Sequence, residues 1–469
     1  MTRWVRILVA LCAAAMTSIG FVVSTEATPS ATLTRSPYLT DLVAAHVTVN
    51  WATTTAVAGS HVTYGRVGKE PCRAHRVNAT STPISVGAVS EFQWKAQLTA
   101  LAKNTSYCYR VFGDSTDLLG PGPAQTFRSQ IPARSSAAFS FAVLGDWGYV
   151  GSTGENLDQE NLVSQIASSG ARFAVTTGDT AYPDGSQLNY GDLQQTGANT
   201  STVFGPSMWT VAGGSIPLFN AQGNHGLRAD ALTNWPQDKA VASSSGRYRM
   251  ETFCCLNGTS SASYPSGWYA FNAGPARFYV LDAAWDNANV GTSSMYGNDH
   301  DYHWDVDSAE YQWLQHDLET HPKTLSFAFF HFPLYTDNAT ERSDPWLQGD
   351  DNLEGLLAQH GVDVVFNGHA HIYERNAPSA SGMPVSYVTG GGGARVEPVS
   401  ACTPIDQYAI GWDYSASTHG SRCGAAALPT TIDQVYHFLL VTVDGAQVTV
   451  TPTDELGRAF DSKTYDFSG

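Results

Sequence analysis

The sequence predicts an α/β domain preceded by a small all-β sandwich. From about residue 36 to 130, short alternating apolar runs follow one another at close intervals, which indicates β-strands. From residue 137 onward, longer apolar runs alternate with helical stretches and loops, which is typical of α/β architecture. We therefore expect a β-sandwich over 36–130, a linker over 130–138 and an α/β domain over 137–460.

The β-sandwich prediction depends on period-two alternation. In HVTVNWAT, residues 46–53, the side chains of Val47, Val49 and Trp51 lie on one face of an extended chain. Further strands are expected in HVTYGR, FQWKAQL, SYCYRVFG and AQTFRS. Several short strands within one small domain indicate a sandwich of the fibronectin or immunoglobulin type.

Apolar runs of the second region end on residues that commonly bind metals. These residues are Asp146, Asp179, Asn224 with His225, His331, and the pair His369 and His371. Helices are expected between the runs, over 156–170 and 307–321. Because the carboxyl ends of such strands line the ligand crevice, we expect the side chains to converge at one edge of the sheet. One Gly-Asp or Asn-Gly dipeptide indicates only a turn, but this series indicates a metal site.

The stretch FNGHAHIYER, residues 366–375, carries two histidines just after a buried apolar run. Gly368 marks the turn that ends this run. If the backbone stays extended, His369 and His371 point the same way. Two imidazoles on one face either hold one metal between them or serve two neighbouring metals.

Composition limits the classes of partner. The hydrophobic share of 42% is that of a globular protein, and the formal net charge of −17 argues against a surface that binds nucleic acid. Binding a small anion requires a local cation, such as a metal, that reverses the field. Beyond the N-terminal segment, no stretch is apolar and long enough to span a bilayer. We expect a small-molecule substrate and no nucleic-acid partner.

The N-terminal segment has the pattern of a secretory signal peptide. The basic stretch MTRWVR precedes the apolar stretch ILVALCAAAMTSIGFVV, and small polar residues follow. We therefore predict a signal peptide over 1–31, cleaved after Ala27 or Ala31, and a secreted protein without membrane attachment after cleavage. A short membrane anchor is the alternative.

Export makes the cysteine pattern informative, because disulfides form in oxidising compartments. The six cysteines after the signal segment are Cys72, Cys108, Cys254, Cys255, Cys402 and Cys423. We expect Cys72–Cys108 and Cys402–Cys423 as local disulfides. Whether the adjacent Cys254 and Cys255 bridge each other or stay reduced is left open.

Motifs at the strand ends carry a family resemblance. GDWG (145–148), GDTAY (178–182), GNH (223–225), the histidine of FFHFPLY and GHAHIYER (368–375) resemble the five sequence blocks of the purple acid phosphatases. These enzymes belong to the calcineurin-like metallophosphoesterases, and the tyrosine of GDTAY is the most discriminating feature. The resemblance covers nearly all of the mature chain. It implies a mixed-sheet αββα sandwich preceded by a fibronectin III-like domain.

The resemblance also implies a site for two metals. It implies a first metal, Fe(III), bound by Asp146, Asp179, Tyr182 and His371. Asp179 would bridge to a divalent metal (Zn, Fe or Mn), which Asn224, His331 and His369 would complete. Hard carboxylate and phenolate oxygens suit trivalent iron, whereas imidazole and amide ligands suit the divalent metals.

The activity implied by the resemblance is that of a secreted acid phosphatase. It would hydrolyse phosphate monoesters by attack of a metal-bound hydroxide, with His225 as the general acid. Asn224, His225 and Arg375 would contact the phosphate. For His225 a structural role is the alternative, and for Arg375 an ion pair with a nearby carboxylate. The alternative functions are a phosphodiesterase, nucleotidase or phytase on the same core and, more distantly, a non-catalytic secreted binding protein.

Two positions depart from the family pattern. Gly226 follows the GNH block, where many relatives carry an acidic residue, and Glu341 stands where plant and animal members have a further histidine. The glycine-rich stretch TGGGGARV (389–396) is expected to form a tight loop that approaches the site. Asp282 is expected to be structural, and His300 and His303 to lie in a surface loop.

Overall fold

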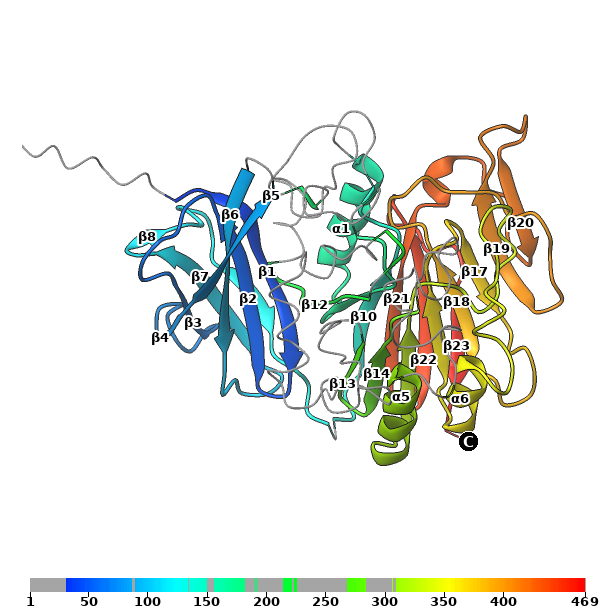
Figure 1. The fold of residues 1–469 in the computed structure, drawn as a ribbon, viewed down its shortest axis with the longest axis horizontal. Coiled ribbons are helices and arrows are strands. Elements are labelled where there is room, and N and C mark those ends of the chain that lie inside the picture. Colours follow the sequence, from blue (N-terminus) through cyan, green and yellow to red (C-terminus); the bar gives the residue numbers. More distant parts are fainter. Residues whose placement is uncertain are drawn as a thin grey trace, which may run out of the picture. The chain divides into compact units, whose positions relative to one another are not determined.

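The computed structural model describes residues 31–86, 89–133, 135–149, 156–180, 182, 190–191, 214–221, 223–225, 268–283, 306 and 309–468 (Figure 1). Residues Ala31–Gly469 form one compact unit. The predictions for the signal peptide, for Gly226, for the Cys254 and Cys255 pair and for His300 and His303 fall outside the described residues, except for the last position of the signal peptide. Throughout the described part of the chain, no helix has both the length and the apolar character needed to cross a bilayer.

The N-terminal region is all-β, as predicted. Its strands are β1 (Leu33–Val43), β2 (His46–Thr53), β3 (His61–Arg66), β4 (His75–Asn78), β5 (Thr80–Val86), β6 (Val89–Leu98), β7 (Ser106–Gly113), β8 (Thr116–Asp117) and β9 (Gln125–Arg128). One sheet has the order β4-β3-β7-β8, with β9 paired to β7, and β1, β2, β6 and β5 belong to another sheet. Val49 and Trp51 of β2 share a hydrophobic core with Val62 of β3 and Tyr109 of β7, so the two sheets form a sandwich.

Strand β2 differs from the predicted alternation in one respect. Val47, Val49 and Trp51 are fully buried, but Thr48 and Asn50 on the opposite face are buried as well. Asn50 Nδ2 donates a hydrogen bond to Thr40 Oγ1 at 2.9 Å. Polar side chains are therefore tolerated on the second face because a neighbouring strand supplies partners.

The sheet that contains β1 continues into the second region. Its order is β23-β22-β21-β10-β11-β12-β1-β2-β6-β5. The added strands are β10 (Phe139–Leu144), β11 (Ala174–Thr176), β12 (Leu218–Phe219), β21 (His437–Asp444), β22 (Gln447–Asp454) and β23 (Lys463–Asp466). Strands β1 and β12 pair in parallel at Thr40 and Leu218. The boundaries predicted for two domains therefore divide a sheet that is continuous in the structure.

An eight-stranded sheet completes the second region, in the order β13-β14-β15-β16-β18-β17-β19-β20. Its strands are β13 (Tyr269–Ala273), β14 (Ala276–Val280), β15 (Leu325–Phe329), β16 (Val364–Asn367), β17 (Tyr373–Asn376), β18 (Val385–Thr389), β19 (Asp406–Trp412) and β20 (Gly420–Gly424). Pairing is parallel from β14 through β15 and β16 to β18 and antiparallel elsewhere. The prediction of mixed sheets is confirmed.

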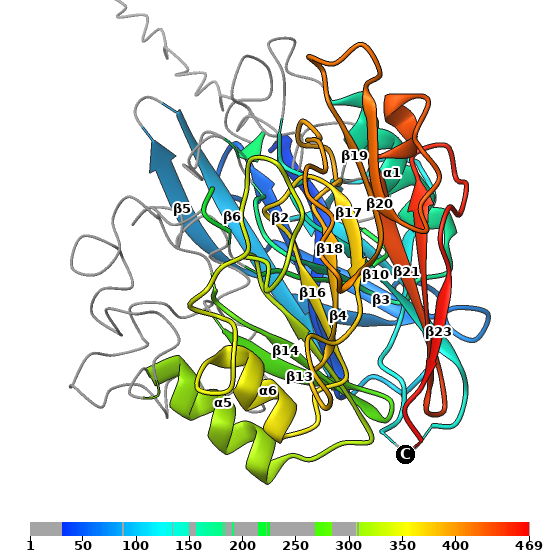
Figure 2. The same ribbon diagram turned by 90° about the vertical axis from the view of Figure 1, so that its right-hand side faces the viewer.

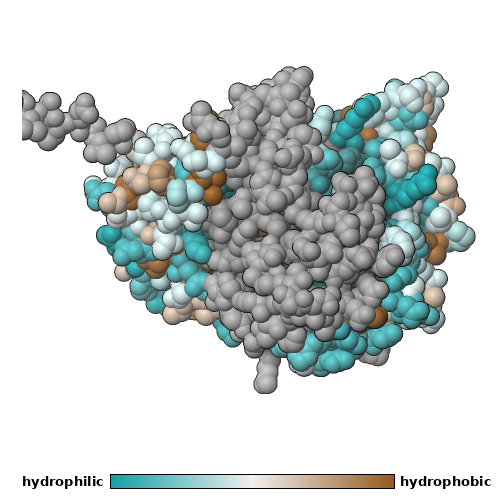
Figure 3. All heavy atoms as spheres, in the orientation of Figure 1, coloured by the Kyte–Doolittle hydropathy of each residue, from teal (hydrophilic) through white to brown (hydrophobic). Residues whose placement is uncertain are grey.

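Aromatic side chains join the two large sheets. Phe141 of β10 contacts Phe278 of β14 edge to face, with ring centroids 5.0 Å apart, and Phe327 of β15 at 5.5 Å. Such edge-to-face contacts add to the free energy gained by burying the rings. The described surface is mostly hydrophilic in Figure 3. Large exposed apolar side chains such as Val67 and Leu456 are few.

Within the described residues, few helices accompany the sheets. They are α1 (Leu157–Ser168), α5 (Ala309–Thr320), α6 (Leu353–Gln359) and the short 3-10 helix η5 (Ile432–Gln434). The helices predicted over 156–170 and 307–321 are confirmed as α1 and α5. Leu162 of α1 belongs to the same buried cluster as Leu144 of β10. Helices α5 and α6 lie next to one another (Figures 1 and 2). Asn156 caps α1 by accepting a hydrogen bond from the Gln159 amide at 3.1 Å.

The two disulfides predicted as local bridges are both present. Cys72 is bonded to Cys108 and Cys402 to Cys423, each with Cα atoms 5.4 Å apart. The first ties the segment before β4 to β7, and the second ties the segment before β19 to β20. Disulfides are typical of proteins that fold in an oxidising compartment.

Candidate metal centre

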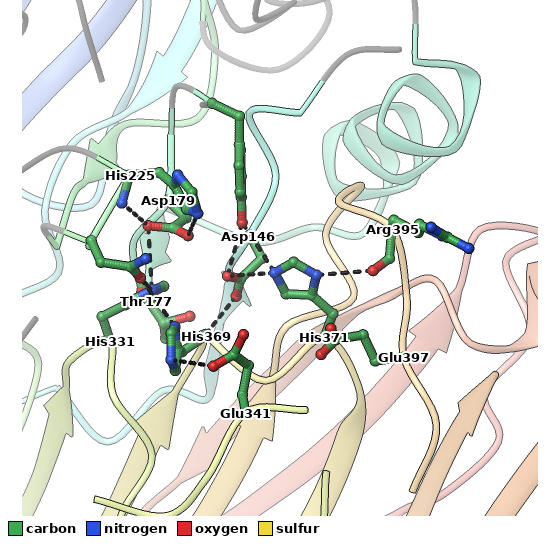
Figure 4. Close-up of polar contacts among 12 residues, drawn as sticks. Asp146, Thr177, Asp179, His225, His331, Glu341, His369, His371, Arg395 and Glu397 are labelled. Carbon is green, nitrogen blue, oxygen red and sulfur yellow. Dashed lines mark hydrogen bonds and ion pairs between the residues drawn. The ribbon is translucent and has the colours of Figure 1, made fainter. Parts of the chain in front are cut away.

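The metal-binding side chains predicted at strand ends do converge, but they come from two sheets. Strands β10, β11 and β12 of the ten-stranded sheet precede Asp146, Asp179 and Asn224, whereas β15 and β16 of the eight-stranded sheet precede His331 and His369. The expectation of a single sheet edge was therefore wrong. The carboxyl ends of strands from both sheets meet at the site (Figure 4).

Glycines before the candidate metal ligands allow this close approach. A Cβ atom added at Gly145 would lie 2.0 Å from Thr177 Oγ1, and one at Gly223 would lie 2.1 Å from Asp179 Oδ1. The residues Asp146, Asp179 and His369 have φ values of 57°, 54° and 68°, in the left-handed region that side chains rarely adopt. Such backbone strain clusters at functional sites, because the surrounding structure must hold it in place.

One group of donor atoms is formed by Asp146, Tyr182 and His371. Tyr182 Oη lies 3.2 Å from Asp146 Oδ1 and 3.1 Å from His371 Nε2. His371 Nε2 lies 3.3 Å from Asp146 Oδ1. A carboxylate, a phenol and an imidazole thus direct one atom each at a common point. We call this group the tyrosine cluster.

The hydrogen-bond partners of the tyrosine cluster fix its chemistry. His371 Nδ1 lies 2.9 Å from the Arg395 carbonyl oxygen, so this nitrogen carries the proton and Nε2 faces the cluster. Burial, followed by the charges of Asp179 and Asp146, raises the pKa of Tyr182 well above its ordinary value. Without a cation, Tyr182 therefore stays protonated.

A second group is formed by Asn224, His331 and His369. Asn224 Oδ1 lies 2.7 Å from His331 Nε2 and 3.0 Å from His369 Nδ1. The other ring nitrogen of His331, Nδ1, lies 2.8 Å from the Thr177 carbonyl oxygen. We call this group the amide cluster. Its imidazole and amide donors suit a divalent transition metal.

Asp179 connects the two clusters. Its Oδ1 lies 3.3 Å from His331 Nε2 of the amide cluster, and its charge acts on Tyr182 of the tyrosine cluster. Asp179 is 1% exposed, and its Oδ2 has no hydrogen-bond partner among the described residues. Burial alone would raise the pKa of Asp179, but the charges of His331 and His225 lower it. A buried, ionised carboxylate with an unpartnered oxygen fits a bridging ligand.

The two histidines of the GHAHIYER block serve different clusters, although not by the predicted geometry. His369 and His371 lie in a turn between β16 and β17 rather than on extended backbone. Within this turn, the amide of Ala370 donates to the Gly368 carbonyl at 2.8 Å. The bend directs His369 towards Asn224 and His371 towards the tyrosine cluster.

His225 lies at the rim of the site. Its side chain is 33% exposed, and its Nε2 lies 3.9 Å from Asp179 Oδ2. Its ring centroid lies 4.2 Å from that of Tyr182. The backbone amide of His225 also donates to Asp179 Oδ1 at 2.9 Å. Among the described residues, Asp179 thus places a carboxylate beside His225.

Arg375 and the glycine-rich loop occupy supporting positions. Arg375 pairs with Asp461 through Nε at 2.7 Å and Nη2 at 3.2 Å, which is the ion pair considered as its alternative role. In the glycine-rich loop, the amide of Ala394 donates to the Asp146 carbonyl at 2.7 Å. The loop thus approaches the site as predicted. Asp282 is buried, and its amide donates to Glu310 Oε1 at 2.8 Å.

Sequence reasoning left the role of Glu341 open and did not find Arg395 or Tyr414. Glu341 Oε2 lies 3.0 Å from His369 Nε2, and this hydrogen bond lowers the pKa of Glu341. Glu341 and His369 line a cavity of about 490 Å³. His371, Arg395 and Tyr414 line another of about 510 Å³, in which Arg395 stacks on the Tyr414 ring at 4.2 Å. Arg395 lies within the glycine-rich stretch 389–396, for which only a tight loop was expected, and no motif marks Tyr414.

Known relatives agree with this architecture. The family model for calcineurin-like phosphoesterases matches residues 139–373, and the model for the N-terminal domain of purple acid phosphatases matches 37–141. A purple acid phosphatase from yellow lupin (Lupinus luteus) seeds shares the fold, with a TM-score of 0.61 at 15% identity, over 92% of this chain and 74% of that chain.

Sequence relatives are similar over part of their length. Purple acid phosphatase 15 of Arabidopsis thaliana is 24% identical over 327 residues, covering 64% of this chain and 53% of the relative. Purple acid phosphatase 18 of the same plant is 26% identical over 366 residues, covering 75% and 69%. An acid phosphatase of Aspergillus ficuum is 22% identical over 401 residues, covering 65% and 64%. The chain thus spans little more than half of the first of these relatives.

The match to the phosphoesterase model takes up half of the chain and contains all the donor residues of both clusters. The match to the N-terminal domain model covers the preceding region and overlaps it at residues 139–141. The chain therefore belongs to the calcineurin-like phosphoesterases and, within them, to the purple acid phosphatase family.

Proposed function

We propose that this protein is a secreted acid phosphatase that hydrolyses phosphate monoesters at a dinuclear metal centre. The observation that carries the proposal is the pair of donor clusters joined by Asp179. The family implies a dinuclear metal centre, and the donor atoms of Asp146, Asp179 and His331 lie within 4.8 Å of one another. The proposal goes beyond family membership in naming the reaction, the ligands and the metals.

The donor sets fit two different metals. Asp146, Tyr182 and His371, together with Asp179, would hold Fe(III), because oxygen donors suit a trivalent ion. Asn224, His331 and His369, again with Asp179, would hold a divalent metal (Zn, Fe or Mn), because imidazole and amide donors suit such ions. When bound, two cations neutralise the phosphate and make water a better nucleophile at moderately low pH.

Residues around the clusters orient the donors. The carbonyl oxygens of Thr177 and Arg395 hold the Nδ1 atoms of His331 and His371, which leaves both Nε2 atoms directed into the site. For His369 the arrangement is reversed, because Glu341 holds Nε2 and Nδ1 faces Asn224. Partners of this kind set the tautomer and raise the basicity of the ring.

His225 is the proposed proton donor for the leaving alkoxide. It is partly exposed at the rim, where a leaving group must depart, and Asp179 lies 3.9 Å from its Nε2. A general acid must lie within reach of the leaving oxygen and carry a proton that it can transfer. The cavity beside His371 offers the Arg395 and Tyr414 pair to an aromatic or anionic leaving group.

Metal analysis combined with a visible spectrum tests the proposal. We expect about two metal ions per chain, one of them iron, with a tyrosinate charge-transfer band, and hydrolysis of an aryl phosphate between about pH 4 and 7. Asp179→Asn should lose both metals and activity, whereas Asp444→Asn, the same change at an exposed position, should lose neither. Protein without iron, or without activity on aryl phosphates, would contradict the proposal.

A phosphodiesterase activity is the second candidate, and Glu341 is the observation that favours it. Its carboxylate lies beside His369, in the cavity next to the amide cluster. A negative charge there repels a dianionic monoester more strongly than a monoanionic diester. Comparing rates on the monoester and the bis-ester of one phenol separates the two activities. A faster rate on the bis-ester would favour the phosphodiesterase.

Secretion is proposed from the N-terminal pattern and from the two disulfides. N-terminal sequencing of protein recovered from culture medium tests it. A first residue shortly after Ala27 or Ala31 is expected, and recovery of the full-length chain from the cell interior would contradict it.

A further inference from the structure

A second group of acidic residues lies outside the proposed metal centre. Asp337, Glu374 and Asp406 are 3%, 0% and 7% exposed. One carboxylate oxygen of each lies within 4.8 Å of the others. We call this group the acidic cluster. Buried carboxylates so close together repel one another unless a proton or a cation compensates their charge.

Strand pairing brings the members together. Glu374 and Asn376 are two residues apart on β17, so their side chains share one face of the strand. Asn376 is paired with Asp406 at the start of β19. Asp337 comes from the segment after β15, and its amide donates to Glu374 Oε2 at 2.8 Å. Asp337 Oδ2 in turn accepts a hydrogen bond from the Thr403 amide at 2.8 Å.

Several oxygen atoms of this group have no hydrogen-bond partner among the described residues. They are Glu374 Oε1, Asn376 Oδ1 and both carboxylate oxygens of Asp406. Asn376 is 1% exposed, and its amide oxygen is a neutral hydrogen-bond acceptor that adds no charge to the group. Within the described part of the chain, no Lys, Arg or His forms an ion pair with any of the three acids. Buried polar atoms without protein partners are available to an ordered water or a cation.

We propose that Asp337, Glu374, Asn376 and Asp406 form a binding site for a Ca²⁺ ion. All the available donors are oxygens, which a hard cation prefers to nitrogen or sulfur. Mg²⁺ fits less well, because it retains several waters and rarely occupies a buried all-protein site.

The nearby disulfide does not supply ligands. The sulfurs of Cys402 and Cys423 lie within 4.8 Å of an Asp406 oxygen. They are bonded to each other, so neither is the thiolate that a soft metal requires. The disulfide instead fixes the segment that leads into β19 and thereby limits the movement of Asp406.

A cation at this position would join three segments of the chain. It would hold the segment after β15 to β17 and to the start of β19. The same segment continues from Asp337 to Glu341, which contacts His369. We therefore expect the ion to stabilise the fold and this segment without contacting the substrate.

Calcium analysis and thermal unfolding of the purified, metal-loaded protein test the proposal. After dialysis against calcium-free buffer and re-equilibration with CaCl₂, we expect about one Ca²⁺ per chain in addition to the transition metals. The melting temperature should rise by several degrees with Ca²⁺, because a ligand that binds only the folded state stabilises it. Absence of bound Ca²⁺ together with an unchanged melting temperature would overturn the proposal and indicate that the acids share protons.

Variants locate the ion. Asp406→Asn should lose the bound Ca²⁺ and its effect on the melting temperature, whereas Asp444→Asn, an exposed control, should keep both. Asp146→Asn, which alters the tyrosine cluster, should also keep both. Ca²⁺ binding that survives in Asp406→Asn but disappears in Asp146→Asn would overturn the proposal. If Asp406→Asn does not fold, the calcium content and melting temperature of the unsubstituted protein decide the question.

Discussion

Replacing Glu341 tests whether this carboxylate orients His369 for a divalent metal. Glu341 Oε2 lies 3.0 Å from His369 Nε2, and Nδ1 of the same ring lies 3.0 Å from Asn224 Oδ1. A hydrogen bond to a charged group such as the Glu341 carboxylate contributes about 1.5–3 kcal/mol. The Glu341 side chain is 36% exposed, so solvent screening favours the lower end of this range. A loss of about 1.4 kcal/mol corresponds to a tenfold weaker affinity for the metal.

Calorimetric titration of a divalent metal into protein depleted of that metal measures this effect directly. We expect about tenfold weaker binding for Glu341→Ala. Glu341→Gln should lose less, because its amide oxygen still accepts the hydrogen bond. Glu319→Gln on α5 is a matched control at an exposed position and should bind normally. Unchanged affinity in Glu341→Ala would refute the reasoning.

Three further predictions concern other parts of the molecule. Tyr182→Phe should remove the visible absorption band of the iron-loaded protein, and a band that persists would show that Tyr182 does not bind iron. Arg375→Lys should lower the melting temperature and leave KM unchanged, because one ammonium group cannot form both hydrogen bonds to Asp461; a raised KM at an unchanged melting temperature would instead support a phosphate contact. Burial, followed by the charge of Asp158, raises the pKa of Glu455 from 4.5 to about 8. The folded protein therefore binds the extra proton, and the free energy of unfolding should fall as pH rises across this interval. For Glu455→Gln, the free energy of unfolding, measured with urea at both ends of this pH interval, should fall less than in the unsubstituted protein. An equal fall would contradict the assignment.

The sequence was most informative where a short motif contains both the donor and the glycine that lets it approach its neighbours. Gly145 and Asp146 are such a pair, because the glycine has no room for a side chain and the aspartate adopts a positive φ. The lack of space and the positive φ are both local requirements, so they restrict which residues can occupy these two adjacent positions. The same holds for helix α1, whose cap at Asn156 and apolar periodicity lie within one short segment.

Features that depend on distant pairing could not be predicted in this way. The parallel pairing of Thr40 with Leu218 makes one sheet of two predicted domains, and nothing near either residue indicates its partner. Likewise, Thr48 and Asn50 are buried, although a polar face of a strand usually faces solvent. Their hydrogen bonds to β1 side chains exist only once the strands have paired.

The GHAHIYER block shows why a contiguous motif need not have one role. A bend at His369 sends this ring to the amide cluster and His371 to the tyrosine cluster, so two neighbouring histidines come to separate donor groups. Strand β17 begins two residues after His371, and successive side chains there point to opposite faces of the sheet. Glu374 then faces the acidic cluster, whereas Arg375 faces the opposite side and pairs with Asp461. Substitutions at adjacent positions of this block should therefore separate metal binding, calcium binding and fold stability, although all of them fall within one motif.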